Sequence, residues 1–160
     1  CSMKELNIVT PLISVTYDEL SPGDRRLVDA AKKMTYRAYA PYSHFSVGAA
    51  ILLDNDVIVT GSNQENAAYP SGLCAERTAA FYAHANYPDA RFKAIAIAAR
   101  ETSGEEIPQP ISPCGGCRQV LAEYEQLAGH DVKVILAGRD CIYIVPSVKS
   151  LMPLAFTSFS

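Results

Sequence analysis

Three cysteines in two short segments, about forty residues apart, constrain this chain more than any other feature. Cys74 is followed two residues later by Glu76, and Cys114 is separated from Cys117 by two residues. Thiolates at such spacings bind a metal ion, usually zinc, when the fold brings the two segments together. The fold must therefore place residues 74–76 and 114–117 at one site.

The acid beside the first cysteine favours a catalytic site over a structural one. Three protein ligands leave one position of a zinc ion open, where the metal acidifies a bound water. A nearby carboxylate that does not bind the metal can carry protons from this water to a leaving amine. A Cys-x-Glu segment followed by Pro-Cys-x-x-Cys is also the signature of zinc deaminases that act on nucleobases. We therefore interpret Cys74, Cys114 and Cys117 as ligands and Glu76 as the proton carrier.

The residues around both segments predict that each segment begins a helix. A turn-forming run at residues 70–72 precedes Cys74, and residues 75–85 favour a helix. A proline precedes Cys114, two glycines follow it, and residues 117–127 favour a second helix. Two helix N-termini would then point at the metal, and their partial positive charge favours thiolate over thiol.

Three thiolates around one divalent ion leave a net negative charge, which makes a bound water less acidic than neutral histidine ligands would. The helix ends compensate for part of this charge. Two arginines adjoin the proposed site, Arg77 next to Glu76 and Arg118 next to Cys117. Either guanidinium could donate hydrogen bonds to the sulfurs.

A structural zinc site is the main alternative, because Cys-x-x-Cys pairs are common in structural sites closed by a fourth ligand. The possible fourth ligands are Cys141, His44, His84 and His130, and none has the paired spacing of a zinc knuckle. Cys141 lies in an apolar run, where we expect it to be a small buried side chain. The Cys-x-Glu segment favours the catalytic alternative.

Composition and charge favour a single domain over residues 1–160 that acts on a small molecule. With 49% hydrophobic and 19% charged residues, the chain has an ordinary globular composition. Cys1 and Ser2, which precede Met3, are interpreted as a cloning remnant. The net charge of −3, with scattered Lys and Arg, provides no footprint for nucleic acid.

No apolar run of the sequence is long enough to span a membrane, and no secretory signal opens the chain. We therefore expect a cytoplasmic protein without a membrane partner. Five cysteines, an odd number, make a poor disulfide framework.

The polarity pattern predicts an α/β fold, a three-layer α/β/α sandwich around a five-stranded mixed sheet. The first helix should begin at Ser21–Pro22 and end at Pro41, and residues 1–17 should form an irregular arm or a short strand. Strands are predicted at residues 45–53, 57–62, 92–99, 133–137 and 141–145, and further helices at 74–85, 117–128 and 147–152.

Five segments resemble, in order and approximate spacing, the small homotetrameric cytidine deaminases that bind zinc through three cysteines. These segments are residues 39–50, 63–70, 74–79, 112–121 and 151–156, so the resemblance covers about residues 20–156. It implies a cytidine deaminase-like fold and the zinc-dependent hydrolysis of cytidine and deoxycytidine to uridine and deoxyuridine, with release of ammonia. It also implies a homotetramer that serves pyrimidine salvage.

The same resemblance implies roles for individual residues. It assigns zinc to the three cysteines, proton transfer to Glu76, compensation of thiolate charge to Arg77, sugar contacts to Asn63 and Glu65, and ring stacking to Phe45. Further substrate contacts fall on Ala75, Tyr69 and Phe156, of which the last two match positions that reach a neighbouring subunit's site. Without the resemblance, we would interpret Asn63 and Glu65 as solvated loop residues. Phe45, Tyr69 and Phe156 would be interpreted as residues of a core or an interface.

Two other functions stay open at this point. A blasticidin-S-type nucleoside deaminase has a similar metal motif, although the Asn63-x-Glu65 pair and the segment around Phe45 favour ordinary nucleosides. A non-enzymatic protein with a structural zinc is the second alternative. The sequence departs from common family usage at Gln64 and Gly116, and we expect Gly116 to loosen the start of its helix.

Overall fold

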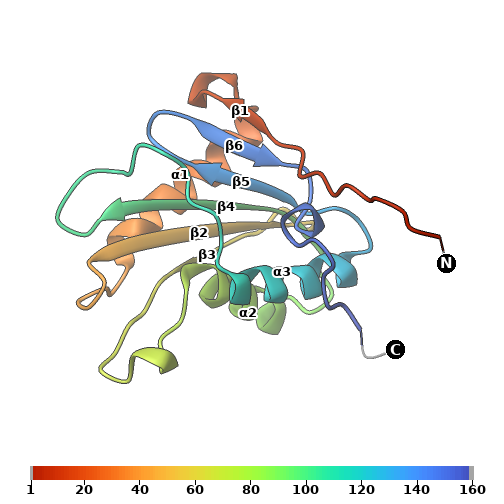
Figure 1. The fold of residues 1–160 in the computed structure, drawn as a ribbon. Coiled ribbons are helices and arrows are strands. Elements are labelled where there is room, and N and C mark those ends of the chain that lie inside the picture. Colours follow the sequence, from red (N-terminus) through yellow and green to blue (C-terminus); the bar gives the residue numbers. More distant parts are fainter. Residues whose placement is uncertain (1, 159–160) are drawn as a thin grey trace.

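The central sheet has six strands in the order β1-β6-β5-β4-β2-β3 (Figure 1). The computed structural model describes residues 2–158, so Cys1 of the predicted cloning remnant lies outside the described residues. The strands are β1 (Ile13–Val15), β2 (Phe45–Leu53), β3 (Ile58–Ser62), β4 (Phe92–Glu101), β5 (Lys133–Ala137) and β6 (Ile142–Val145). β4 and β5 pair in parallel and the other neighbours pair antiparallel, so the sheet is mixed as predicted.

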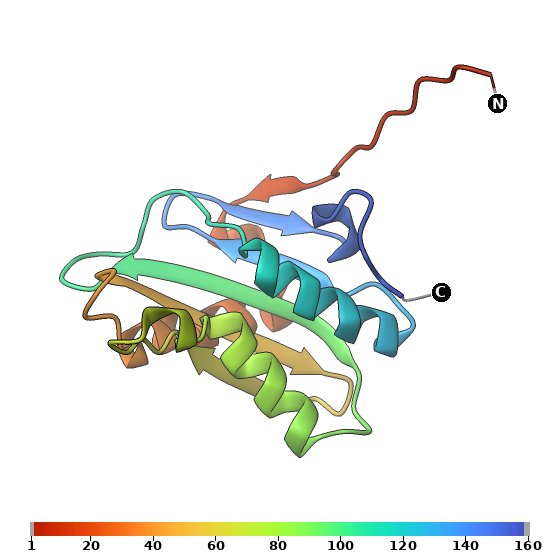
Figure 2. The same ribbon diagram turned by 60° about the horizontal axis from the view of Figure 1, so that its bottom comes forward.

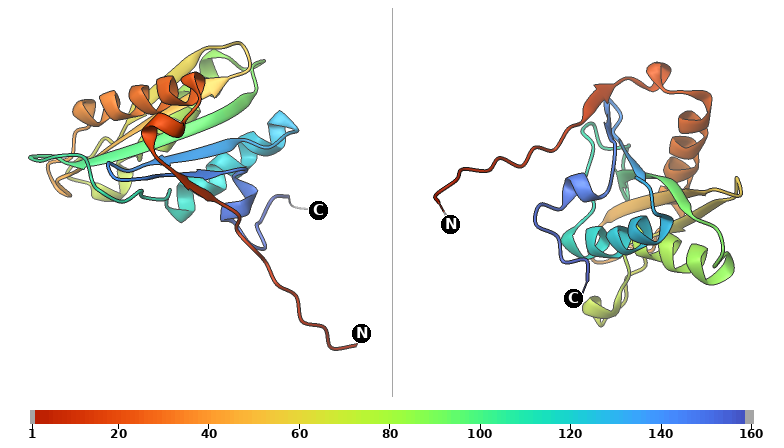
Figure 3. Two further views of the ribbon diagram at one scale, coloured as in Figure 1. Left: turned by 90° about the horizontal axis from the view of Figure 1, so that it is seen from above. Right: turned by 90° about the vertical axis from the view of Figure 1, so that its right-hand side faces the viewer.

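The predicted number of five strands is wrong, because β1 adds a sixth at the edge next to β6. Only three residues form this strand, and Ile13 and Ser14 are exposed. A strand that pairs on one side and buries little has no clear apolar alternation, so polarity left open whether residues 1–17 form an irregular arm or a short strand, and the structure contains both. Residues 2–12 extend from β1 away from the sheet (Figure 3).

Helices cover both faces of the sheet (Figures 2 and 3). α1 (Pro22–Met34) packs on one face, and α2 (Ala75–Asn86) and α3 (Gly115–Ala128) lie side by side on the other. Alternation along β4 divides its side chains between the two cores, since Ile95 and Ile97 face α2 and α3 whereas the alanines between and beside them face α1. No helix within residues 2–158 combines the length and apolarity needed to cross a membrane.

Two predicted helix boundaries differ from the structure. The Ser21 hydroxyl caps α1 as expected and accepts a hydrogen bond from Asp24 N at 3.2 Å. The helix ends at Met34, before the predicted end at Pro41, and a 3₁₀ turn (Thr35–Arg37) follows. The Thr35 hydroxyl donates to the Lys32 carbonyl at 2.7 Å, which satisfies one of the final carbonyls of α1.

The second boundary concerns α3, which begins at Gly115 with Cys114 as its N-cap. The sequence predicts a start at Cys117, because glycine disfavours a helix interior. Both glycines instead occupy the first turn, where open space surrounds them. The early start places Cys117 in the first turn of α3, a position that matters for the site.

The carboxylate of Glu125, near the end of α3, fixes the C-terminal part of the chain. It accepts hydrogen bonds from Val132 N at 2.8 Å, Val148 N at 2.7 Å and Lys149 N at 3.0 Å. Residues 149–151 form a 3₁₀ turn at this point, so the helix predicted at residues 147–152 is reduced to a single short turn. The α3 helix therefore supports both the candidate site at its N-terminus and the C-terminal segment along its length.

The sheet approaches the helices most closely at two glycines. A Cβ on Gly48 of β2 would lie 2.0 Å from the Ala31 carbonyl oxygen of α1, and one on Gly61 of β3 would lie 2.6 Å from Ala79 N of α2. The obstructing atoms belong to backbone, which cannot move away as a flexible side chain can. The distance between the sheet and each helix layer therefore depends on having glycine, which has no Cβ, at these two positions.

Replacing Gly48 by alanine should lower the free energy of unfolding by at least about 2 kcal/mol, because α1 must move away from β2. Urea denaturation measures this change. Gly23→Ala is the matched control, since an added Cβ in the first turn of α1 meets nothing within 4 Å. Equal stabilities of the two variants would contradict the close packing of α1 on β2.

Candidate active site

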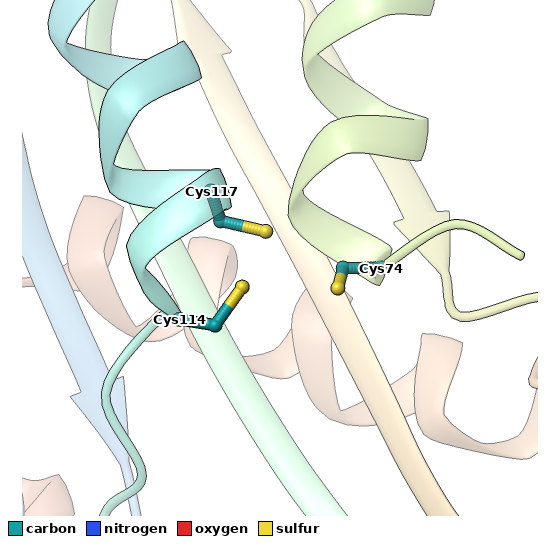
Figure 4. A group of neighbouring side chains, drawn as sticks. All are labelled: Cys74, Cys114 and Cys117. Atoms are coloured by element: carbon teal, nitrogen blue, oxygen red, sulfur yellow. The ribbon is translucent and has the colours of Figure 1, made fainter. Parts of the chain in front are cut away.

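The two helix N-termini bring the three motif cysteines together (Figure 4). Cys74 is the N-cap of α2, and Cys114 is the N-cap of α3 with Cys117 in the first turn of that helix. Their sulfur atoms all lie within 4.8 Å of one another. Figure 4 shows the three side chains directed toward a common point between the helices.

The arrangement fits a zinc ion. Sulfurs about 2.3 Å from a tetrahedral ion lie roughly 3.8 Å apart, so the observed spread of up to 4.8 Å needs only a small contraction. Among the described residues, no histidine, carboxylate or further cysteine joins this group. Cys141, one of the possible fourth ligands, lies instead against Gln109, with 3.5 Å from its sulfur to Oε1. The donor set therefore leaves a tetrahedral ion one position without a protein ligand.

The cluster has an uneven distribution of charge. A hydrogen bond from the Cys117 thiol, followed by the guanidinium of Arg77, lowers the pKa of Cys74 to about 5 despite partial burial. The same interaction with Cys74, together with burial, raises the pKa of Cys117. Of these two sulfurs, Cys74 ionises first, at a helix N-terminus whose dipole also favours thiolate.

Of the two arginines considered for charge compensation, only Arg77 contacts a sulfur. Its Nη2 donates to Cys74 Sγ at 3.4 Å, and its buried Nε has no hydrogen-bond acceptor within residues 2–158. Arg118 donates instead to Pro113 O at 2.8 Å, Leu151 O at 2.7 Å and Ser112 Oγ at 2.8 Å. The suggestion that Arg118 compensates the thiolates is therefore wrong, and this side chain ties the loop before Cys114 to the C-terminal segment.

Glu76 lies in the first turn of α2 and is only 5% exposed. Burial raises the pKa of this carboxyl above its usual value, and the charge of Cys74 raises it further. A carboxyl whose pKa is shifted toward neutrality can both accept and donate protons near pH 7. The structure thus brings a group suited to proton transfer to the edge of the sulfur cluster.

A pocket of about 470 Å³ opens beside the cluster. Cys74, Cys114 and Glu76 form part of its wall, and the segments around β2 and after β3 form the opposite part. Most residues with an expected role at the substrate line the pocket, namely Phe45, Asn63, Glu65, Tyr69 and Ala75, and so does Arg77, which is expected to compensate the thiolate charge. A pocket of this size suits a small organic ligand.

Asn63 directs its amide toward the backbone of β2 beside the pocket. Its Oδ1 accepts from Val47 N at 2.8 Å and its Nδ2 donates to Phe45 O at 2.9 Å. The amide of Gln64 is directed elsewhere, toward Arg37 O at 3.3 Å and Ser62 Oγ at 3.1 Å. Asn63 keeps one N–H and one oxygen lone pair available for a ligand.

Glu65 accepts hydrogen bonds from the loop that precedes β2. Its Oε2 accepts from Tyr42 N at 2.9 Å and Ser43 N at 3.2 Å, and its Oε1 accepts from the Ser43 hydroxyl. Partial burial alone would raise the pKa of Glu65, but these three hydrogen bonds together hold it below its usual value. The carboxylate is therefore ionised near pH 7 and bound to its own chain.

Two aromatic residues differ in where the structure places them. Tyr69 lies at the pocket, where its ring meets that of Tyr42 edge-on at a centroid distance of 6.2 Å. Phe156 is absent from the pocket lining, and its carbonyl accepts a hydrogen bond from Gln119 of α3 at 2.8 Å. One chain alone does not bring Phe156 to the site.

Sequence reasoning gave no role to several residues of the pocket wall, including Ser43, Leu73, Ile111 and Ser112. Ser43 lies within residues 39–50, the first segment that resembles the family, so the sequence marked its position. Nothing in the sequence indicated that its hydroxyl contacts Glu65. The contact with Glu65 joins residues 22 apart in sequence and exists only when the loop before β2 folds over the end of β3.

Comparison with known proteins agrees with this geometry. The family described as the cytidine and deoxycytidylate deaminase zinc-binding region matches residues 22–128. A cytidine deaminase of Halalkalibacterium halodurans is 40% identical over 82% of this chain and 92% of its own length. One from Sporosarcina psychrophila is 48% identical over 62% of this chain and 68% of its own length. A crystal structure of cytidine deaminase from Burkholderia pseudomallei superposes with a TM-score of 0.68 at 40% identity, covering 82% of this chain and 97% of that one.

Replacing Cys117 by serine should reduce bound zinc to well below one ion per chain, because a hydroxyl is a much poorer zinc ligand than a thiolate. Mass spectrometry of metals in dialysed protein measures the content. Cys141→Ser is the matched control and should retain its zinc, since this sulfur contacts Gln109 outside the cluster. Equal zinc in both variants would contradict a site built from the three sulfurs.

Proposed function

The chain belongs to the family of the cytidine and deoxycytidylate deaminase zinc-binding region, and from this premise we propose that it is a single-domain, zinc-dependent cytidine deaminase. The reaction converts cytidine and deoxycytidine to uridine and deoxyuridine and releases ammonia, in the context of pyrimidine salvage. The observation that carries the proposal is the buried carboxyl of Glu76, with its raised pKa, beside a three-sulfur cluster that opens into a pocket.

Cys74, Cys114 and Cys117 would hold the zinc ion. When bound, zinc supplies an acidified water as the nucleophile for the C4 carbon of the cytosine ring. Arg77 and the N-termini of α2 and α3 offset the charge of three thiolates, which would otherwise weaken that acidification. The site thus combines a strong donor set with local positive charge.

Glu76 would move the protons of the reaction. Its carboxylate accepts a proton from the attacking water, and the protonated carboxyl then delivers it to the leaving amine. A raised pKa suits the second step, because the carboxyl holds its proton more firmly than an exposed one until the amine accepts it. Phe45, across the pocket, would stack on the pyrimidine ring and hold C4 near the zinc site.

Asn63 and Glu65 would read the sugar, with Ala75 in contact with the ligand through the buried start of α2. A substrate without a sugar leaves the remaining acceptor site of Glu65 and the free N–H of Asn63 unpaired, so free cytosine should be a much poorer substrate than cytidine. A phosphate on the sugar should also be disfavoured, because Glu65 repels it and Arg77, the basic residue of the pocket wall, is engaged with Cys74.

Loss of the ultraviolet absorbance of cytidine on adding the protein tests the proposal directly. Activity that disappears when the metal is stripped and returns with zinc supports a metal-dependent deaminase. Turnover of blasticidin S in place of cytidine would indicate the related antibiotic-type deaminase. Zinc binding without turnover of either compound would indicate a structural-zinc protein.

Changing Glu76 to glutamine should lower turnover of cytidine by about 10² or more, because the amide cannot carry the proton. Zinc content should stay at the level of the unmutated protein, since Glu76 is not one of the clustered ligands. Glu105→Gln, at an exposed acid paired with Arg139, is the control and should keep full activity. Near-normal turnover by zinc-loaded Glu76→Gln protein would refute the assignment.

We further propose that the enzyme is a homotetramer whose active sites receive residues from neighbouring subunits. Two features support this proposal. Tyr69 at the pocket and Tyr42, whose ring contacts it, are more than half exposed, and so is Phe156 on the C-terminal segment. An aromatic residue that matches a substrate-contacting position but lies outside its own pocket needs a second chain in order to act.

Sedimentation velocity should then give a particle of about four times the 17.3 kDa chain mass. Mixed oligomers of Phe156→Ala and Glu76→Gln chains should be more active than either variant alone, because some sites then combine an intact Glu76 with an intact Phe156 from a neighbour. A fully active monomer, or mixed oligomers no more active than the parent variants, would contradict shared sites.

A further inference from the structure

The hydroxyl of Ser43 stands between two groups that face the substrate from different segments. It donates to Oε1 of Glu65, and it accepts a hydrogen bond from the backbone N–H of Phe45 at 3.2 Å. Ser43 itself lines the pocket. One side chain therefore links the carboxylate expected at the sugar to the residue expected at the base.

The hydrogen bonds of Glu65 leave it little capacity for a ligand. A carboxylate has about four acceptor sites, two on each oxygen. The N–H groups of Tyr42 and Ser43 occupy both sites of Oε2, and the Ser43 hydroxyl occupies one site of Oε1. A single acceptor site remains, on the oxygen beside Ser43. The serine therefore sets which carboxylate oxygen, and which direction, a sugar hydroxyl can use.

Ser43 and Asn63 both form hydrogen bonds with the backbone of Phe45. Ser43 Oγ holds the Phe45 N–H, and Asn63 Nδ2 holds the Phe45 carbonyl at 2.9 Å. Both backbone polar groups of Phe45 are thus bound by side chains of the pocket wall. Fixing the two flanking peptide groups fixes the direction in which the Phe45 ring leaves the backbone.

We propose that Ser43 is a positioning residue that makes the site specific for a nucleoside over a free base. Its hydroxyl presents one oxygen of Glu65 to the sugar and holds Phe45 for the ring, so that sugar and base are bound together. The inference rests on the proposed function, because it takes the ligand to be a pyrimidine nucleoside. A purely structural serine would stabilise the loop but would not change how strongly the sugar adds to binding.

Binding of uridine and uracil to the zinc-loaded protein, measured by titration calorimetry, tests the inference without turnover. Losing a hydrogen bond to a charged group should reduce the uridine-to-uracil affinity ratio about tenfold in Ser43→Ala. Ser43→Cys keeps the size of the side chain but has only a weak hydrogen-bond donor, so its uridine-to-uracil affinity ratio should fall by a similar factor. This variant tests the inference even if the alanine variant folds poorly. Ser43→Thr keeps the hydroxyl and should retain the ratio within about threefold.

Ser46→Ala is the matched control. This serine lies in β2, three residues after Ser43, and is 1% exposed, and its hydroxyl pairs with Thr102 Oγ1 at 2.8 Å away from the pocket. Loss of the Ser46 hydroxyl should lower the free energy of unfolding and leave the uridine-to-uracil affinity ratio unchanged. For cytidine turnover, Ser43→Ala should raise KM about tenfold while kcat changes less than about threefold, since Glu76 and the sulfurs are untouched.

The outcomes separate this inference from the proposed function. An unchanged affinity ratio in Ser43→Ala, or an equal fall in Ser46→Ala, overturns the role of Ser43. Uridine binding with the expected loss in Ser43→Ala, but no cytidine turnover by the unmutated protein, supports the role of Ser43 and rejects deamination. If the unmutated protein binds neither uridine nor uracil, both are rejected.

Discussion

The site depends on a topological constraint: α2 and α3 must begin at the same edge of the sheet and on the same face. β2 pairs antiparallel with both β3 and β4, and β4 pairs in parallel with β5, so β3, β4 and β5 run in one direction. The connections β3-α2-β4 and β4-α3-β5 both cross the sheet in the same sense, and the right-handed rule then puts both helices on one face. Their N-termini meet side by side, which is why cysteines forty residues apart in sequence can share one ion (Figure 2).

This constraint explains why much of the fold could be predicted from the sequence and why parts could not. The long apolar runs of β2 and β4 predict strands from their composition alone, and a cysteine after turn-forming residues predicts a helix N-terminus. β1 left no such signal, because an edge strand with exposed side chains buries too little to impose a pattern. The start of α3 at Gly115 was missed because propensity describes helix interiors, whereas first-turn residues have other requirements.

The residues of the candidate site also differ in whether the sequence could predict their contacts. The metal cluster and Glu76 could be predicted because their geometry follows from short local spacings on two helices. Ser43 could not be given a role, because its contact with Glu65 depends on how a loop folds across the end of β3. Arg118 shows the opposite error: adjacency to Cys117 in sequence suggested a contact with sulfur, but the helix directs the side chain toward Pro113 and Leu151.

The two walls of the pocket have different mechanical support, and this difference bears on how the enzyme divides its tasks. The wall that carries Cys74 and Glu76 consists of helix N-termini packed on the sheet, where Gly61 leaves almost no space between β3 and α2. The wall that carries Ser43 and Glu65 consists of loop segments fixed by side chain to backbone hydrogen bonds. Under the proposed function, zinc and the proton carrier must keep a fixed geometry for the chemistry, whereas the loop wall holds the sugar and the Phe45 ring that stacks on the base. We therefore expect changes in the loop wall to act mainly on binding and changes at the helix ends mainly on turnover, because the groups proposed to hold the nucleoside lie on one wall and those proposed to react with it lie on the other.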